Sequence, residues 1–386
     1  MAGKAEQNVV IVGGGFAGPQ IAKQLSKKLD PKRYNLILIN SRSYAVSLPA
    51  TVRLVVDAES RLEETSFVKL DRIYANGNGQ TKVGIVTSIE AQPGVPGGAV
   101  VLANGERISY AVLILATGSK WSGPSGIPEN EDDVLPFVDA WRQKFAKAKH
   151  VVIVGGGAVG IELAGEVKDL YPATTVLTNY ATQTKKVTIV HGGNELINAT
   201  YGSSLRKGLE KRLRARGVEF IFNEYIDDIP EPGVVGVTTR SGKHIPDADL
   251  VVSARGGRPN TDYVASLGED ALNGHGFVKI KPTMQLLNHP SIFAVGDIID
   301  WAEQKQIAKL KWHAPVILAN VVSFLNGVTP TKKYAGAPEM IVITNGRKGG
   351  MGYFGFLGGF TLGDWFAWLV KSRHFMVPHF RKDLGY

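Results

Sequence analysis

Residues 9–18 read VVIVGGGFAG, and residues 151–160 read VVIVGGGAVG. Each stretch is a short apolar strand that ends in a run of glycines, and apolar residues at helical spacing follow it. A second apolar strand comes next in each case, at 35–39 and at 187–190. This completes a βαβ unit of the length expected for a dinucleotide site. One glycine fingerprint is weak evidence, but two complete units in one chain predict two nucleotide-binding domains.

The glycines within each unit have different tasks. In the first unit Gly13 forms the tight turn, Gly15 lets the backbone approach a pyrophosphate, and Gly18 lets the helix pack on the strand. The helix N-terminus then faces the phosphates. The corresponding residues of the second unit are Gly155, Gly157 and Gly160. We therefore expect each unit to bind the pyrophosphate of one dinucleotide.

Two further strand ends complete the pattern. Strand 112–115 ends in Ala116-Thr117-Gly118, between the two units, and strand 292–295 ends in Gly296-Asp297, after both of them. Either turn alone is typical of an ordinary strand end. Their order along the chain resembles that of the two-dinucleotide-binding flavoproteins, in which the late Gly-Asp returns to the first domain.

This resemblance implies an α/β fold with two Rossmann-like domains, in which an FAD-binding domain is split by an inserted NAD(P)H-binding domain. A small C-terminal module completes the chain. The expected boundaries are 1–145 and 266–330 for the two parts of the FAD domain, 146–265 for the NAD(P)H domain and 331–386 for the module. A chain of 386 residues exceeds what one hydrophobic core usually organises, which agrees with this division.

Within this superfamily the chain resembles the apoptosis-inducing-factor-like group, and most of all its ferroptosis-suppressor branch. The more specific marks are 155–162 (GGGAVGIE), His313-Ala314 with Ala319-Asn320, and 370–373 (VKSR). The resemblance implies hydride transfer from NADH or NADPH to FAD, followed by reduction of a quinone-type acceptor.

The resemblance also assigns residues around FAD. Asp297 is expected to accept a hydrogen bond from the ribitol, beside Gly296 and the turn at 116–118. Asn40 ends the second strand, where a carboxylate commonly holds the adenosine ribose. An amide can still bond a hydroxyl, although without charge assistance.

Two residues of the second unit concern the nicotinamide cofactor. His191 occupies the position where an acidic residue would repel a 2′-phosphate, so NADPH is admissible beside NADH. Glu162 lies in the first turn of the second helix, where related enzymes bring a carboxylate to the nicotinamide, and we expect it to orient the carboxamide. As an exposed residue it would only complement the helix dipole. Glu166, one turn later, has no expected role.

Arg53 and His313 are the candidates for contact with the flavin ring. Arg53 lies in a segment that passes near the isoalloxazine in this family, where a cation would favour reduced flavin; the alternative is a solvated arginine. His313 precedes a buried helix that we expect to begin at Pro315 and to aim its N-terminus at the flavin. It would contact flavin or acceptor, although an isolated histidine is more often structural. Lys309 and Lys311 are expected to lie on the surface.

Composition excludes several kinds of chemistry. The chain has no cysteine, which excludes disulfides, thiolate metal sites and dithiol mechanisms, and with them the flavin disulfide reductases. The eight histidines show no metal-ligand spacing, so no metal is expected. The net charge of +9 suits phosphate cofactors, an anionic membrane or nucleic acid. No basic stripe with interleaved aromatics supports nucleic-acid binding.

The aromatic tail has two readings. Its large apolar residues are Phe354, Phe356, Leu357, Phe360, Leu362, Trp365, Phe366, Trp368 and Leu369. Basic residues follow them, and this combination suits a membrane interface. Alternatively, residues 340–369 pack on the FAD domain and bury most of these rings.

The start of the chain bears on location. Only residues 1–8 precede the first apolar run, so we expect no targeting peptide and a cytoplasmic protein. Peripheral attachment to a membrane, such as the mitochondrial outer surface, is the alternative.

Two other functions would use the same domains. A reductase of an iron–sulfur or rubredoxin-like carrier would need an acidic protein partner, which the basic charge permits. A signalling or nucleic-acid-binding protein would keep FAD as a structural group. The C-terminal resemblance speaks against the carrier reductase, and the lack of a basic stripe with interleaved aromatics speaks against nucleic-acid binding.

Overall fold

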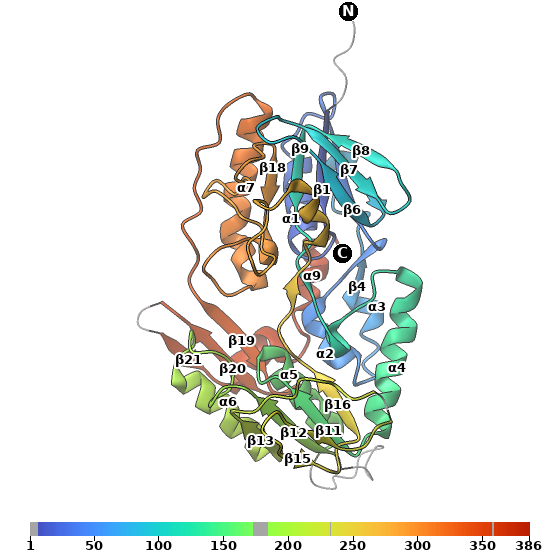
Figure 1. The fold of residues 1–386 in the computed structure, drawn as a ribbon, viewed down its shortest axis with the longest axis vertical. Helices are drawn as coiled ribbons and strands as arrows, with labels where there is room; N and C mark the ends of the chain where they lie inside the picture. Colours follow the sequence, from blue (N-terminus) through green and yellow to red (C-terminus); the bar gives the residue numbers. More distant parts are fainter. Residues whose placement is uncertain (1–6, 173–183, 232, 357–358) are drawn as a thin grey trace, which may run out of the picture.

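The computed structural model describes residues 7–172, 184–231, 233–356 and 359–386. Two parallel sheets organise the chain (Figure 1). The first runs in the order β18-β9-β1-β2-β5 and contains β1 (Gln7–Val12), β2 (Tyr34–Asn40), β5 (Gln80–Val83), β9 (Val112–Leu115) and β18 (Ile292–Ala294). Because β18 follows the second nucleotide unit in sequence yet pairs with β9, this first domain is built from two separate pieces of the chain.

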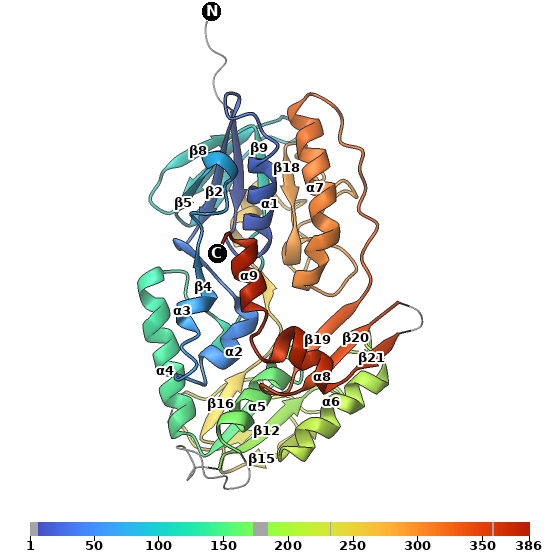
Figure 2. The same ribbon diagram turned by 180° about the vertical axis from the view of Figure 1, so that it is seen from behind.

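Both faces of the first sheet are covered. The apolar residues of β1 and β9 are almost fully buried, as is typical of parallel strands with a layer on each side. Helices α1 (Ala17–Ser26) and α7 (Leu310–Leu325) lie side by side on one face (Figure 2). The antiparallel strands β6 (Val86–Glu90), β7 (Gly98–Leu102) and β8 (Arg107–Tyr110) lie on the other (Figure 1).

The second sheet belongs to one continuous stretch of chain. Its order is β13-β12-β11-β16, with β11 (His150–Val154), β12 (Lys186–His191), β13 (Val218–Phe222) and β16 (Leu250–Ser253) all paired in parallel. Helices α5 (Ala158–Leu170) and α6 (Ser203–Ala215) pack on it, and α4 (Val134–Lys147) leads into it. This second domain is inserted into the first, so the expected fold class is confirmed.

Short elements connect the two domains. The outgoing and returning connections pair with each other as β10 (Ser119–Lys120) and β17 (Arg258–Pro259). The remaining short elements are β3 (Tyr44–Val46), α2 (Thr51–Leu54), α3 (Glu63–Ser66), β4 (Phe67–Lys69), β14 (Val237–Thr238) and β15 (His244–Ile245). The paired connections fix the two ends of the inserted domain next to one another.

The C-terminal module does not pack where we expected. Its antiparallel strands β19 (Met340–Thr344), β20 (Gly350–Phe354) and β21 (Phe360–Leu362) lie with α8 (Asp364–Ala367) beside α5 and α6 of the second domain (Figure 2). The reason is steric fit, since Met351 of β20 rests directly on Gly208 of α6, and Ile343 joins the core of the second domain.

The end of the chain returns to the first domain. Helix α9 (Val377–Asp383) places Phe380 and Leu384 in the core of the first domain. The ring of Phe380 stacks on Phe16, which directly follows the first glycine turn. The tail therefore contacts both domains.

Helix α7 begins earlier than the sequence indicated. It starts at Leu310, and Pro315 lies inside it rather than at its start. The proline removes one hydrogen bond, because it has no N–H to offer the carbonyl one turn before. The preceding turn remains helical because Leu310, His313 and Ala314 are buried against the first domain.

Candidate active site

The first glycine turn leaves open space at one position only. A methyl group on Gly13 would lie 2.4 Å from the carbonyl oxygen of Ala116, and one on Gly18 would lie 1.9 Å from that of Gly13. Gly13 also has a φ of +114°, which side-chain-bearing residues rarely adopt. No atom lies within 4 Å of a methyl group built on Gly15. The open position is the one where a pyrophosphate would approach the backbone.

The second turn repeats this geometry. A methyl group on Gly155 would lie 2.6 Å from the Ala254 carbonyl oxygen, and one on Gly160 would lie 2.0 Å from that of Gly155. Gly157 is open, with nothing within 4 Å. Both turns therefore fit a dinucleotide pyrophosphate at the N-terminus of the following helix.

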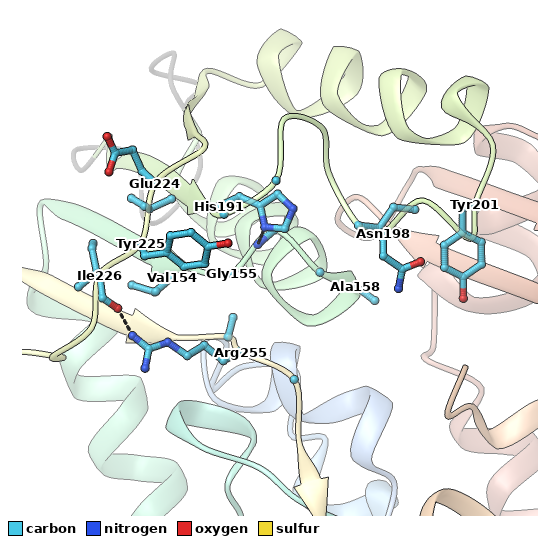
Figure 3. A pocket seen from close by; sticks show the side chains of 18 of the residues that line it. Val154, Gly155, Ala158, His191, Asn198, Tyr201, Glu224, Tyr225, Ile226 and Arg255 are labelled. Carbon is cyan, nitrogen blue, oxygen red and sulfur yellow. Dashed lines mark hydrogen bonds between the residues drawn. The ribbon is translucent and has the colours of Figure 1, made fainter. Parts of the chain in front are cut away.

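A cavity of about 780 Å³ extends from the second turn. Figure 3 shows Tyr225 and Glu224 on one side of it and Asn198 and Tyr201 on the other. Its volume is in the range of cofactor-binding clefts. Residues Gln304–Gln306 of the first domain also line it, so both domains contribute to the pocket.

His191 lies in this pocket, as expected for its place at the end of β12. Its Nδ1 accepts a hydrogen bond from the Gly156 N–H, with a nitrogen–nitrogen distance of 3.1 Å. Burial lowers the pKa of His191, so the ring is neutral near pH 7. Arg255 lies nearby and donates to the backbone carbonyls of Ile226 and Asp227 (Figure 3). The residue at the end of β12 in this pocket is therefore a neutral histidine and not a carboxylate.

Asp297 lies beside the Ala116-Thr117-Gly118 turn, as the order of motifs predicts. The Ser119 hydroxyl donates to its carboxylate over 3.0 Å, and burial raises the pKa of Asp297. Thr117 donates to the carbonyl of Asn260, and the Asn260 N–H donates to the Gly118 carbonyl over 2.9 Å. Gly296, Asp297 and the turn thus meet at one edge of the first sheet.

The amide of Asn40 is already used by the backbone. Its Oδ1 accepts from the Gly14 N–H over 2.9 Å, and its Nδ2 donates to the carbonyls of Arg42 and Tyr44. Asn40 therefore braces the glycine turn. Contact with the ribose of FAD stays a prediction. A ribose hydroxyl would have to share Asn40 Oδ1 with the Gly14 N–H.

Arg53 is buried and paired with a carboxylate rather than solvated. Its side chain is 4% exposed, and the guanidinium contacts both oxygens of Glu166 over 2.6 and 2.9 Å. It also donates to the carbonyls of Ser372 and Arg373 and stacks on Phe375 at 4.5 Å. Burial raises the pKa of Glu166 to about 7, while Arg53 opposes that rise. Arg53 thus joins α2, α5 and the tail. The solvated reading is wrong, and contact with the flavin ring stays a prediction.

Glu162 is buried toward the C-terminal module. Its carboxylate accepts from the ammonium of Lys371 over 2.7 Å and from the Thr344 N–H over 2.9 Å. The exposed alternative is therefore wrong, since its side chain is 5% exposed. Contact with the nicotinamide stays a prediction. Lys371 belongs to the terminal VKSR mark, but no local pattern predicted that it pairs with Glu162.

His313 is held on both sides by protein. Its Nε2 lies 2.9 Å from a carboxylate oxygen of Glu303, and its Nδ1 accepts from the Gly296 N–H over 3.4 Å. Tyr334 donates to the other oxygen of Glu303 and packs edge-on against the histidine ring. This arrangement fits a structural role for His313, because protein groups already occupy both ring nitrogens and neither is free to contact an electron acceptor.

Lys309 is buried, contrary to expectation. It forms an ion pair with Glu339 over 2.8 Å and also donates to two backbone carbonyls. Lys311 is exposed, as expected. The two lysines differ because Lys309 faces the segment that leads into β19.

Several aromatic rings of the tail remain at the surface. Trp365 is 67% exposed, and the other exposed members of the set are Phe356, Phe360, Trp368 and Leu369. Phe354 and Phe366 are half-buried against them, and Leu357 lies outside the described residues. The expectation that the module buries most of these rings is therefore wrong. No helix among the described residues is long and apolar enough to cross a membrane.

Comparison with known proteins identifies the family. Residues 7–312 match the family described as pyridine nucleotide-disulphide oxidoreductase. The chain belongs to this family. We had expected the absence of cysteine to exclude the chain from this family, and that expectation is wrong. The dithiol chemistry itself remains excluded, because it requires cysteine.

Individual relatives agree with the resemblance found in the sequence. The chain is 42% identical over 332 residues to the FAD-dependent oxidoreductase FVFD30 of Flammulina velutipes, covering 86% of this chain and 99% of that protein. It is 26% identical to apoptosis-inducing factor homolog B of Dictyostelium discoideum, covering 98% and 97%. It is 29% identical to ferroptosis suppressor protein 1 of Xenopus laevis, covering 98% and 96%. The expected relationship is confirmed.

Solved structures share the fold. The sulfide:quinone oxidoreductase of Aquifex aeolicus has a TM-score of 0.73 at 19% identity, covering 97% of this chain and 90% of that one. Putidaredoxin reductase, in its covalent complex with putidaredoxin, has a TM-score of 0.67 at 21% identity, covering 91% and 82%. At such identities the likeness concerns the fold alone.

Proposed function

We propose that this protein is an NAD(P)H dehydrogenase that passes hydride to FAD and then electrons to a quinone-type acceptor. The observation that carries the proposal is the pair of open glycine turns, at Gly15 and Gly157, in two domains. Residues of both domains line the pocket at the second turn. With no cysteine in the chain, electrons cannot rest on an internal dithiol. They must leave to an external acceptor.

The residues divide the binding tasks between the two domains. Gly15 and the N-terminus of α1 would hold the FAD pyrophosphate, with Asp297 on the ribitol, and Gly157 with α5 would hold that of NAD(P)H. Bound FAD would supply the hydride-accepting ring. The buried Arg53–Glu166 pair joins α2, which lies between β2 and β5 of the first sheet in the chain, to α5 of the second domain. It would help to keep the two nucleotides at a fixed separation, as hydride transfer requires.

NADPH is proposed as a substrate beside NADH. The residue at the end of β12 is neutral His191, and the cation of Arg255 lies near it in the same pocket. A 2′-phosphate would therefore meet no carboxylate at His191 and a positive charge nearby.

The tail supports a lipid-soluble acceptor. Its exposed rings Trp365 and Trp368 lie on one short helical segment, and Arg373 stacks on Trp368 at 5.2 Å. Aromatic rings next to cations suit the surface of an anionic membrane, where a quinone would dissolve. We accordingly propose a cytoplasmic protein that binds membranes peripherally.

The visible spectrum and acceptor turnover test this function together. The purified protein should be yellow, and NADH or NADPH should bleach it without oxygen. A quinone should then restore the colour faster than an iron–sulfur carrier protein does. A protein that takes up no FAD would refute the proposal. Faster reoxidation by a carrier protein would support the rival reductase, whose fold putidaredoxin reductase shares.

A further inference from the structure

The pocket of the second domain has a wall that belongs to the first. Gln304 bonds to Asn198 over 2.8 Å and to Thr200 over 3.2 Å, and Gln306 bonds to Tyr201 over 2.6 Å. Lys305 lies between these two glutamines and lines the same cavity. These three residues follow Asp297 by only a few positions, so one loop connects the predicted ribitol site with the nucleotide pocket.

This loop lies near the glycine turn rather than at the far end of the pocket. The Ile197 N–H donates to the Gly156 carbonyl over 2.8 Å, which fixes Asn198 beside the turn. Figure 3 shows Asn198 and Ala158 on one side of the pocket and Tyr225 on the other. Because Gln304 is bonded to Asn198, the loop with Lys305 covers the side where the diphosphate would lie.

Lys305 brings a positive charge that no carboxylate pairs directly, although burial lowers its pKa and the charges of Glu303, Asp297 and Asp300 oppose that lowering. Its ammonium donates to the carbonyls of Ile299 and Trp301 over 2.9 and 3.0 Å. Among the described residues, no carboxylate oxygen lies within 4.0 Å of it, whereas Arg240 in the same pocket is paired with Asp227. An ammonium has three N–H donors, so one is not used by an oxygen, although the ammonium also lies over the Phe277 ring, 5.0 Å from its centre. A half-buried cation with one unused donor favours an anion beside it.

We propose that Lys305 binds the diphosphate of the pyridine nucleotide from the first domain, opposite Gly157 and the N-terminus of α5. The inference rests on the proposed function, because it takes NAD(P)H as the ligand. A bound nucleotide then touches both domains and holds them together.

The test measures binding rather than turnover, with FAD-loaded protein so that the first site is filled. The probes are ADP-ribose, which carries the diphosphate, and adenosine, which carries no phosphate. Lys305→Gln should weaken ADP-ribose binding roughly tenfold, as expected for one charge-assisted hydrogen bond, and should leave adenosine binding within about twofold. Lys311→Gln, an exposed lysine outside the pocket, is the matched control and should change neither.

A second variant separates charge from folding. Lys305→Arg keeps the positive charge and should retain most of the ADP-ribose affinity, with unchanged flavin content. Equal losses in the arginine and glutamine variants, parallel loss of adenosine, or no loss of ADP-ribose would each overturn the assignment. If NAD(P)H bleaches the wild-type protein while Lys305→Gln binds ADP-ribose normally, only this inference fails. If the wild-type protein binds no ADP-ribose and is not bleached, the proposed function fails with it.

Discussion

Replacing Arg53 with Met tests how the domains are held together. In the native protein the guanidinium contacts both oxygens of Glu166, and the two side chains are 4% and 2% exposed. The substitution leaves Glu166 buried with no opposite charge. Such a carboxylate takes up a proton rather than remain ionised, because desolvation disfavours the charged form.

The size of the effect follows from the pKa of Glu166. Its ordinary value of 4.5 is raised to about 7 in the folded protein by burial, with Arg53 opposing that rise. A group with a raised folded pKa stabilises the fold below its unfolded pKa, and this stability is lost as the pH rises through the folded pKa. In the native protein that loss ends near pH 7, where Glu166 ionises beside Arg53. In Arg53→Met the pKa of Glu166 rises further, so the free energy of unfolding continues to fall above pH 7.

The free energy of unfolding should therefore diverge between the two proteins above pH 7. We expect the difference to grow by about 1.4 kcal/mol per pH unit above pH 7 and to be nearly constant between pH 5 and pH 6.5. The constant part comes from the unpaired carbonyls of Ser372 and Arg373 and amounts to about 1–3 kcal/mol.

Urea titrations at several pH values, followed by tryptophan fluorescence, measure this difference. Arg53→Met combined with Glu166→Gln is the control, because it has no titrating group at the pair and should lack the slope. A difference that stays flat from pH 7 to pH 9, or a slope that persists in the double variant, would refute the reasoning.

Four other variants test the site. Gly15→Val should abolish FAD binding, whereas Gly157→Val should keep FAD but prevent bleaching by NAD(P)H, since each side chain enters space that is otherwise open; the reverse outcome would mean that the domains are assigned the wrong way round. His191→Glu should raise the KM for NADPH about tenfold, equivalent to about 1.4 kcal/mol of repulsion, and spare NADH; equal effects would show that the position does not meet the ribose. Replacing Trp365 and Trp368 with Ser should slow turnover with a long-chain quinone in anionic liposomes more than turnover with ferricyanide, at unchanged flavin content; parallel loss would make the tail structural.

Local patterns predicted the fold correctly. The task of Gly18 follows from a steric limit within a few residues, because a methyl group there would meet the Gly13 carbonyl, and Gly13 in turn lies against Ala116 at the end of the neighbouring strand. The return of residues 292–294 to the first sheet followed from the order of motifs. Motif spacing and motif order were therefore sufficient, even where the pairing partners lie far apart in the sequence.

The charged contacts between domains were not predictable in this way. Arg53 and Glu166 are 113 residues apart in sequence, and Glu162 and Lys371 are 209 apart. A charged residue on a helix normally indicates a solvated face, and nothing local distinguishes Glu166 from such a residue. Its burial depends on the C-terminal module, whose strand β19 packs on α5 while Met351 of β20 fits over Gly208 of α6.

The position of β18 affects the order in which the protein folds during synthesis. β9 emerges from the ribosome about 180 residues before β18, its partner, which corresponds to roughly 10 to 40 s at ordinary translation rates. During that time one edge of the first sheet is unpaired and exposed to other chains. The second domain is continuous and can fold in this interval. Its paired connections then bring the two ends of the interrupted domain together, so that β18 adds to the waiting edge without closing a long flexible loop.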